Sequence, residues 1–330
     1  MYLFIDLKIK KYNMKIQSLS IHVPTGKCFN NCKPCVSQMH DSPYLNRIGN
    51  AIDDDIDFTS ATRRAKEEYI RRLQFAKDNG VNTIILTGIG EAIQNKKFLK
   101  WLGEVMKQIG FHWIELQTAG NLLLYKEKSD VKTGDDFDFY SNIAFMRAIG
   151  VSTVSLSLFD MFSSDINAEI TEMPKAHRFE IDELCHKIKQ FNLNLRLSLN
   201  IYRGYKDHSI SEIFERANEL EADQITFRKL YESDDKSLKQ NQWIRLQNTD
   251  GFLDRFFDDL NAYIKENGVF LGKLPFGGMK YSVNDISVVI DDNCMDNAEE
   301  RVDLDVYKYL ILRPNCKLYS DWTYKASLIF

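Results

Sequence analysis

The sequence predicts an α/β fold, arranged as a partial (β/α)6 barrel with a C-terminal α+β appendage. Six short, largely apolar segments alternate with longer segments whose apolar residues recur at helical spacing. Four of the helical segments are followed by glycine or asparagine, the residues that best tolerate the left-handed conformation of a helix C-cap. This alternation is typical of a parallel sheet with right-handed crossovers. A doubly wound sheet shares the same pattern and stays an alternative.

The first predicted strand has alternating polar and apolar residues, and the later ones are short and apolar, as buried parallel strands usually are. The predicted strands are Ile16–Val23, Thr83–Leu86, His112–Leu116, Thr153–Leu158, Leu195–Ile201 and Gln224–Phe227. The predicted helices between them are Ala61–Asn79, Lys97–Ile109, Tyr140–Ile149, Ile181–Phe191 and Ser211–Leu220. In such folds, ligands lie at the carboxyl ends of the strands.

The pattern divides the chain into an N-terminal extension (1–14), the barrel (15–232) and a C-terminal extension (233–330). Met14 is an alternative start, and Lys126–Asp138 is a polar insertion. We expect the C-terminal extension to close the barrel and to shape the substrate pocket. Its predicted elements are a helix at Gly251–Asn267, a segment at Tyr281–Ile290 and a hairpin with arms Lys308–Leu312 and Lys317–Tyr319.

The composition is that of an ordinary globular protein. The 330 residues are 44% hydrophobic and 27% charged, with a net charge of −4. This charge predicts no general affinity for nucleic acid or for anionic membranes. No run of 18 apolar residues is present, so we expect no membrane span. Dispersed cysteines beside one cysteine cluster suit a reducing, cytoplasmic location.

The most informative motif is a cysteine cluster directly after the first predicted strand. Cys28, Cys32 and Cys35 have the spacing C-x3-C-x2-C. A cluster of four iron atoms normally takes four cysteines, so three leave one iron open for catalysis. Two alternatives stay open: a zinc site completed by His22 or His40, and a disulfide with one spare thiol.

Polar residues and glycines follow the second and third predicted strands. Gly88, Gly90 and Glu91 end the segment Thr87-Gly88-Ile89-Gly90-Glu91-Ala92, where the glycines let the backbone approach a ligand closely. Thr118 begins the segment Thr118-Ala119-Gly120-Asn121 after the third strand. Each segment is either part of a ligand site or simply a turn between a strand and a helix.

The fourth to sixth strands carry polar residues as well. Ser157, with Asp160 as a second candidate, lies at the end of the fourth strand. The fifth strand places Arg196, Ser198 and Asn200 on one face at a period of two, which indicates either a lined site or a solvent-facing edge. Arg228, at the end of the sixth strand, is either a ligand for a carboxylate or part of a surface ion pair.

The cysteine spacing resembles the hallmark of the radical S-adenosylmethionine (SAM) superfamily, whose members have a TIM-type barrel. The resemblance covers about residues 18–231 and implies one [4Fe-4S] cluster bound by Cys28, Cys32 and Cys35. The open iron would bind the amino and carboxylate groups of SAM. An electron from the cluster would then split SAM into methionine and a 5'-deoxyadenosyl radical, which abstracts hydrogen from a substrate.

The resemblance also implies roles for the residues at the strand ends. Gly-Ile-Gly-Glu-Ala resembles the family's Gly-Gly-Glu-Pro motif, with Ile89 and Ala92 as departures, and Pro34 replaces an aromatic residue that packs near the adenine. It further implies an electron donor such as a flavodoxin or a ferredoxin. The implied SAM-binding residues are Gly88, Gly90, Glu91, Thr118, Ser157, Ser198, Asn200 and Arg228.

Within the superfamily, Arg203-Gly204 with Glu212 and the segment Phe227–Leu230 resemble the molybdenum-cofactor biosynthesis branch. That branch has a second cluster, but Cys294 and Cys316 here lie far apart. We therefore expect one cluster. The cysteines of the peptide-modifying branch are also missing, which favours a small-molecule substrate, such as a nucleotide, over a peptide.

Cys185 and Cys316 lie outside the cluster motif, and lone cysteines are usually inert and buried. Cys316 is at the predicted hairpin tip, where a glycine would be expected, and a hydrogen-atom donor is the alternative role. The alternative function for the whole chain is a non-catalytic zinc or iron–sulfur regulatory protein on an α/β scaffold.

Overall fold

A computed structural model describes residues 15–25, 28–39, 63–125, 141–274, 278–290, 306–322 and 325–330. The N-terminal extension with Met14, the insertion at 126–138, His40 and Cys294 lie outside the described residues.

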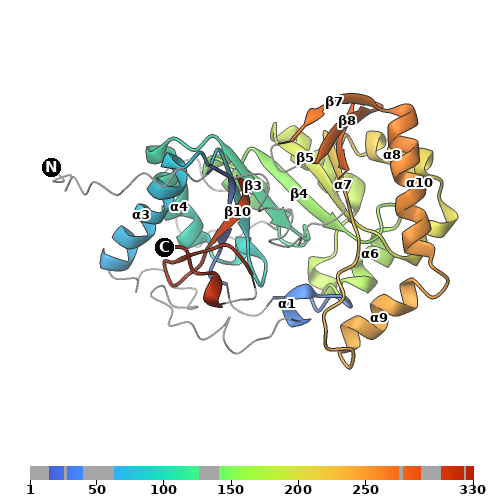
Figure 1. Cartoon of the computed structure of the whole chain (residues 1–330), viewed down its shortest axis with the longest axis horizontal. Coiled ribbons are helices and arrows are strands. Elements are labelled where there is room, and N and C mark those ends of the chain that lie inside the picture. Colours follow the sequence, from blue (N-terminus) through green and yellow to red (C-terminus); the bar gives the residue numbers. More distant parts are fainter. Residues whose placement is uncertain are drawn as a thin grey trace.

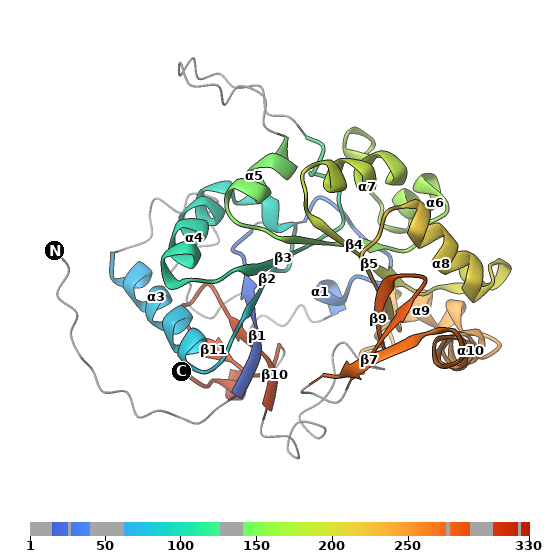
Figure 2. The same cartoon turned by 90° about the horizontal axis from the view of Figure 1, so that it is seen from above.

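The described strands form a single sheet of 11 strands in the order β11-β10-β1-β2-β3-β4-β5-β6-β9-β8-β7. The central six strands are parallel and follow the chain order. They are β1 (Lys15–His22), β2 (Thr83–Thr87), β3 (Trp113–Thr118), β4 (Thr153–Leu158), β5 (Asn194–Asn200) and β6 (Gln224–Arg228). Figure 2 shows them as a curved wall. The predicted fold class, a partial barrel with six central strands, is confirmed.

Helices cover the convex face of the wall (Figure 2). They are α3 (Arg63–Asp78), α4 (Lys96–Ile109), α5 (Asn142–Ala148), α7 (Ile181–Gln190), α8 (Ile210–Glu219) and α10 (Phe252–Asn267). The residues after α3, α4, α5 and α7 that the sequence marks as helix ends, Gly80, Gly110, Gly150 and Asn192, all have positive φ angles. The predicted helix boundaries agree with these helices to within two residues.

The strands alternate between an apolar and a polar face. Leu86, Leu116, Leu156 and Leu197 are fully buried. A Cβ atom added at Gly120 would meet both Leu156 and Leu184 of α7, so this face packs on the helices. Because successive side chains point to opposite faces, the polar residues of the same strands lie on the concave side.

The C-terminal segment adds strands at both edges of the wall. β10 (Val306–Leu312) pairs in parallel with β1, and β11 (Leu318–Tyr319) pairs antiparallel with β10, which confirms the predicted hairpin. At the other edge, β9 (Ile286–Ile290) pairs with β6, followed by β8 (Met279–Val283) and β7 (Val269–Lys273). A role of these strands in closing the barrel and shaping a pocket stays a prediction.

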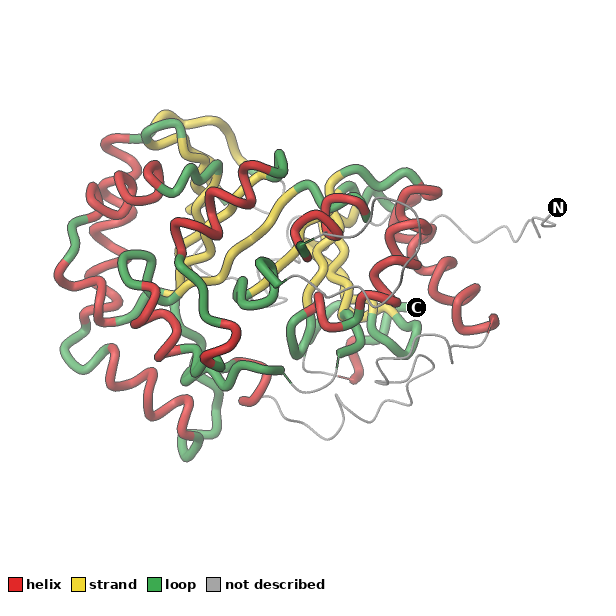
Figure 3. The backbone as a smooth tube through the Cα atoms, turned by 180° about the vertical axis from the view of Figure 1, so that it is seen from behind, coloured by secondary structure: helices red, strands yellow, loops and turns green. Residues whose placement is uncertain are grey.

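Several short elements were not predicted from the sequence. They are α1 (Val36–Met39), α6 (Ser164–Ile170), α9 (Lys239–Gln247) and the 3-10 helices at Ala92–Gln94, Lys175–His177, Arg203–Asp207 and Lys325–Ser327. Figure 3 shows such short helices and turns around the ends of the strands. Among the described helices, none has the length and apolar character needed to cross a membrane.

Candidate functional site

The loop after β1 brings the three motif cysteines together. All three are half-buried. Burial raises the pKa of the Cys32 thiol well above its usual range, and negative charge on Cys35, Cys28 and Glu91 raises it further. Burial also raises the pKa of Cys28, against the effect of the Asn30 backbone N–H. The thiols of Cys28 and Cys32 are therefore hard to ionise, and a bound cationic centre would stabilise their thiolates.

A single metal ion and an iron–sulfur cluster need different arrangements of their donors. A single zinc ion holds each thiolate about 2.3 Å from one point, whereas each cysteine of an iron–sulfur cluster binds a different iron. In the described part of the chain, no group of three or more His, Cys, Asp or Glu side chains converges on one ion. The described cysteines are also free, so the structure gives no support to the disulfide alternative.

The cysteine loop is held in place by α6. The N–H of Asn31 donates to the carbonyl of Thr171 (3.2 Å), and the N–H of Lys33 donates to the carbonyl of Ile170 (3.0 Å). The Lys33 ammonium is 2.9 Å from Glu169. The end of a helix that the sequence did not predict therefore fixes the backbone on both sides of the second cysteine, Cys32.

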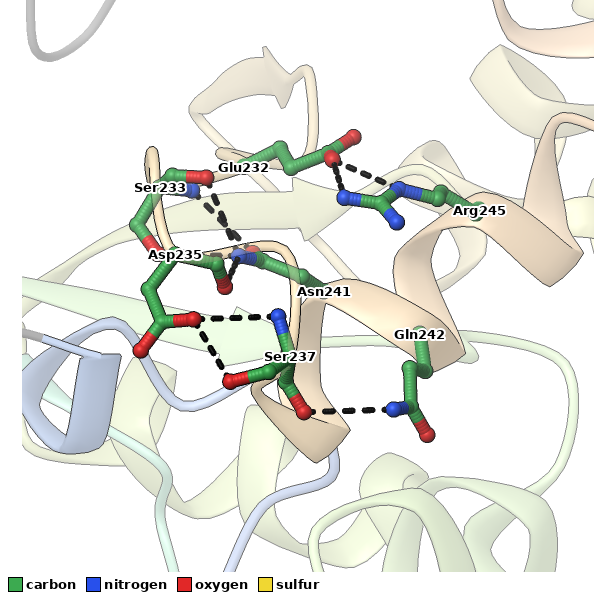
Figure 4. Close-up of polar contacts among 7 residues, drawn as sticks. All are labelled: Glu232, Ser233, Asp235, Ser237, Asn241, Gln242 and Arg245. Carbon is green, nitrogen blue, oxygen red and sulfur yellow. Dashed lines mark hydrogen bonds and ion pairs between the residues drawn. The ribbon is translucent and has the colours of Figure 1, made fainter.

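A second support comes from α9, which lies close to α1 in Figure 1. Gln240 donates to Gln38 (2.8 Å), and Gln38 donates to Asn31 (2.9 Å). Asn241, fully buried, holds the start of α9: it accepts from the N–H of Ser233 (3.1 Å) and donates to the carbonyl of the same residue (3.0 Å) (Figure 4). The loop before α9 thus helps to position the cysteine loop.

We expect Asn241→Ala to destabilise the protein by about 2 kcal/mol, because the buried N–H of Ser233 loses its acceptor. Chemical denaturation measures the loss. The control is Gln242→Ala, one residue along the same helix, whose side chain makes an exposed bond to Ser237 (Figure 4). Its expected cost is below about 0.5 kcal/mol. Equal costs for both variants would contradict a bracing role for Asn241.

Glu91 and Thr118, both predicted from the sequence, are brought into direct contact. The Glu91 carboxylate is buried and accepts from the Thr118 hydroxyl (2.5 Å) and from the N–H of Ala119 (2.8 Å). Burial raises the pKa of Glu91, and these two hydrogen bonds oppose that rise. This Glu91–Thr118 clasp joins the turns after β2 and β3, and the charge of Glu91 acts on Cys28 and Cys32.

Gly88 and Gly90 flank the exposed residue Ile89 on the same turn. A Cβ atom added at Gly88 would lie 3.0 Å from the carbonyl oxygen of Val23 and 3.3 Å from the His22 ring. Gly88 is therefore needed for the close approach of the β1 and β2 ends. Gly90 is half-buried.

The four predicted residues on β4, β5 and β6 also come together. Asn200 donates to the Ser157 hydroxyl (3.0 Å), and Arg228 donates to the Ser198 hydroxyl. Ser157 is paired in register with Ser198, and Asn200 with Arg228. The result is a polar ladder across the carboxyl ends of three neighbouring strands.

The other candidates have partners within the protein. The carboxylate of Asp160 accepts from the N–H groups of Phe162 and Ser163, both at 2.8 Å. It also accepts from the Tyr202 hydroxyl. Arg203 forms an exposed ion pair with Asp250 (2.8 Å), and Glu212 caps α8 through Ser209. These contacts account for the positions of all three candidates without a ligand.

Cys316 is buried, with 4% of its surface exposed, and its thiol donates to the carbonyl of Ala65 (3.3 Å). Its φ angle is +60°, in agreement with the expectation that a glycine would suit this position. Burial raises its pKa to about 11. This environment favours the inert alternative over a hydrogen-atom donor.

An ion pair that was not predicted from the sequence lies on the concave face. Arg196 of β5 reaches across β4 to Glu115 of β3 and also donates to Gln224 of β6 (2.8 Å). The Glu115 side chain is only 5% exposed. The alternation of Glu115 and Gln117 with apolar residues was a sequence signal that could have revealed this polar face.

His22, considered above as a zinc ligand, is buried at the end of β1, and its Nδ1 has no hydrogen-bond partner. Burial, with a smaller contribution from Arg313, lowers its pKa to about 3. The folded protein therefore keeps His22 neutral at pH values where the unfolded chain binds a proton, near pH 6.5 and below.

We expect the free energy of unfolding to fall by up to about 1.4 kcal/mol for each pH unit below 6.5 because of His22 alone. The contribution is fully present above pH 6.5 and is lost progressively toward pH 3. Denaturation of the wild type and of His22→Leu at pH 7.5 and 5.0 measures it. The variant should lose less stability on acidification, and parallel losses would contradict the assignment.

Comparisons with known proteins show the fold. No protein-family model and no curated protein matches the sequence. Two crystal structures of SuiB from Streptococcus suis, the second bound to S-adenosylmethionine, match with TM-scores of 0.53 and 0.54 at 15% and 16% identity. They cover 93% and 95% of this chain. The chain shares the fold of SuiB.

The chain spans 60% and 62% of the two SuiB chains, less than two thirds of their length. A third structure, coproporphyrinogen III oxidase (HemN) from Escherichia coli, described as a radical SAM enzyme, has a TM-score of 0.42 and 15% identity. It covers 80% of this chain and 56% of its own.

Proposed function

We propose that this chain is a radical SAM enzyme. In this proposal Cys28, Cys32 and Cys35 bind a [4Fe-4S] cluster, and the enzyme abstracts hydrogen from a small-molecule substrate. The observation that carries the proposal is the placement of the three motif cysteines in one loop beside the Glu91–Thr118 clasp. Its support is a fold shared with SuiB, a protein whose structure has been determined with bound SAM.

When bound, the cluster supplies the electron that splits SAM. The chain's own residues bind and orient SAM. The backbone at Gly88 and Gly90 approaches its methionyl part closely, next to the buried charge of Glu91. The polar ladder offers the Ser157 and Asn200 side chains to the ribose hydroxyls and the Arg228 guanidinium to the carboxylate. Glu91 is buried, whereas Ser157, Asn200 and Arg228 are half-buried, which leaves their polar groups accessible to a ligand.

Five further assignments belong to the proposal. The substrate is a small, nucleotide-like molecule, and the chain is related to the molybdenum-cofactor biosynthesis branch but has one cluster. A flavodoxin or a ferredoxin delivers the electron, and the enzyme acts in the cytoplasm. The C-terminal strands β7–β11 shape the substrate pocket.

Anaerobic reconstitution with iron and sulfide tests the proposal. We expect a brown protein with cluster absorbance that converts SAM to 5'-deoxyadenosine when dithionite is added. A colourless protein that holds zinc and leaves SAM intact would instead support the regulatory alternative. A brown protein that binds SAM without any cleavage under dithionite would also contradict the proposed enzyme.

A further inference from the structure

Two buried asparagines at the cysteine loop leave amide groups unpaired. Asn30 lies between Cys28 and Cys32, and Asn121 follows the turn after β3. The Asn121 amide donates to the Asn30 side-chain oxygen at 3.0 Å. The residues are 4% and 5% exposed, and the other side-chain atoms, Nδ2 of Asn30 and Oδ1 of Asn121, have no partner.

The orientation of the two amides decides which residue carries the unpaired donor. Exchanging oxygen and nitrogen in both side chains would keep the bond between them but move the unpaired N–H to Asn121 and the unpaired carbonyl oxygen to Asn30. In the structure, the unpaired N–H is that of Asn30. A buried amide without a partner costs about 1–3 kcal/mol, and nearly all buried polar groups in folded proteins have one. An unpaired donor at this place therefore points to a bound group that accepts from it.

The side-chain amide of Asn31, the next residue in the same loop, has partners at both ends. Asn31 donates to Glu172 (2.5 Å) and accepts from Gln38 (2.9 Å), so both ends of its side chain are paired. Asn30, by contrast, has its backbone N–H directed to the Cys28 thiol. The unpaired donor is thus confined to the residue that already contacts the first cysteine of the motif.

We propose that Asn30, held in place by Asn121, donates an amide N–H to a sulfur of the cluster bound by the motif cysteines. The inference rests on the proposed function. A hydrogen bond to cluster sulfur stabilises the reduced, more negative state, so Asn30 raises the reduction potential and eases electron entry from the external reductant. Asn121 is a positioning residue that acts through Asn30.

The test is an EPR-monitored redox titration of the reconstituted full-length protein. We expect Asn30→Ala to make reduction about tenfold less favourable, which for one electron is a shift of about 59 mV to lower potential. Asn121→Ala should shift the potential in the same direction by less. Asn31→Ala is the matched control: it loosens the same loop but should leave the potential unchanged.

The outcomes separate this inference from the proposed function. If the wild type assembles no cluster, the proposed function fails first. If the wild type cleaves SAM and Asn30→Ala has the wild-type potential, only the role of Asn30 is overturned. A shift in Asn31→Ala as large as that in Asn30→Ala would also overturn it, because loop loosening would then be the cause. If Asn30→Ala loses its cluster, the reduction potential of Asn121→Ala is the deciding measurement. A potential of Asn121→Ala equal to that of the wild type rejects the inference.

Discussion

Cys32→Ala should abolish the cluster and, with it, all cleavage of SAM. Cys32 is the middle cysteine of the motif, and its thiol interacts with both Cys28 and Cys35. With two thiolates left, the cluster has half of its usual four ligands. Iron and sulfide analysis should fall from about four of each per chain to near background. The yield of 5'-deoxyadenosine should fall with it.

The matched control is Cys185→Ala, the same substitution at a fully buried cysteine of α7. Its expected effect is a modest loss of stability from the small cavity, with iron content and SAM cleavage unchanged. Iron retained in Cys32→Ala, or iron lost equally from both variants, would contradict the assignment of the cluster ligands.

The largest expected effect on stability is that of Arg196→Met. Glu115 is buried in the wall of the barrel, and Arg196 is its ion-pair partner. Removing the guanidinium leaves a buried carboxylate uncompensated and also takes a donor from Gln224. We expect a loss of about 3 kcal/mol in the free energy of unfolding, measured by guanidinium denaturation.

Two further variants test the cause. Replacing both partners, Arg196→Met with Glu115→Leu, should recover a large part of the loss, since no charge is then left buried. Arg203→Met, which breaks the exposed pair with Asp250, should cost less than about 1 kcal/mol. A double variant no more stable than Arg196→Met would show that the burial of Glu115 is not what makes the pair important.

Local sequence patterns were enough to predict the order of the strands and the ends of the helices. The run Thr153–Leu158 is a strand with the predicted bounds because its apolar residues fit a strand buried on its helix-facing side. Gly110 and Asn192 end their helices because both adopt positive φ angles. Ser198 and Asn200 line one face because side chains alternate along a strand.

These patterns could not predict the short helices or the contacts between residues distant in sequence. α6 has only seven residues, too few for a clear helical period, yet its last turn holds the cysteine loop. Glu91 was predicted to contact SAM, but its bonds to Thr118 and Ala119 depend on the packing of two turns about 28 residues apart. The pairing of β10 with β1 joins residues from the two ends of the chain.

The sequence by itself determined the three cysteines and their spacing, the six-strand repeat and the polar residues at the strand ends, because these follow from periodicity and residue chemistry within short segments. The tertiary structure decided which of those residues meet. Only in the folded chain does Glu91 contact Thr118, Arg196 contact Glu115 and Asn121 contact Asn30. Each of these contacts joins segments that are distant in sequence and that the packing of the sheet brings together.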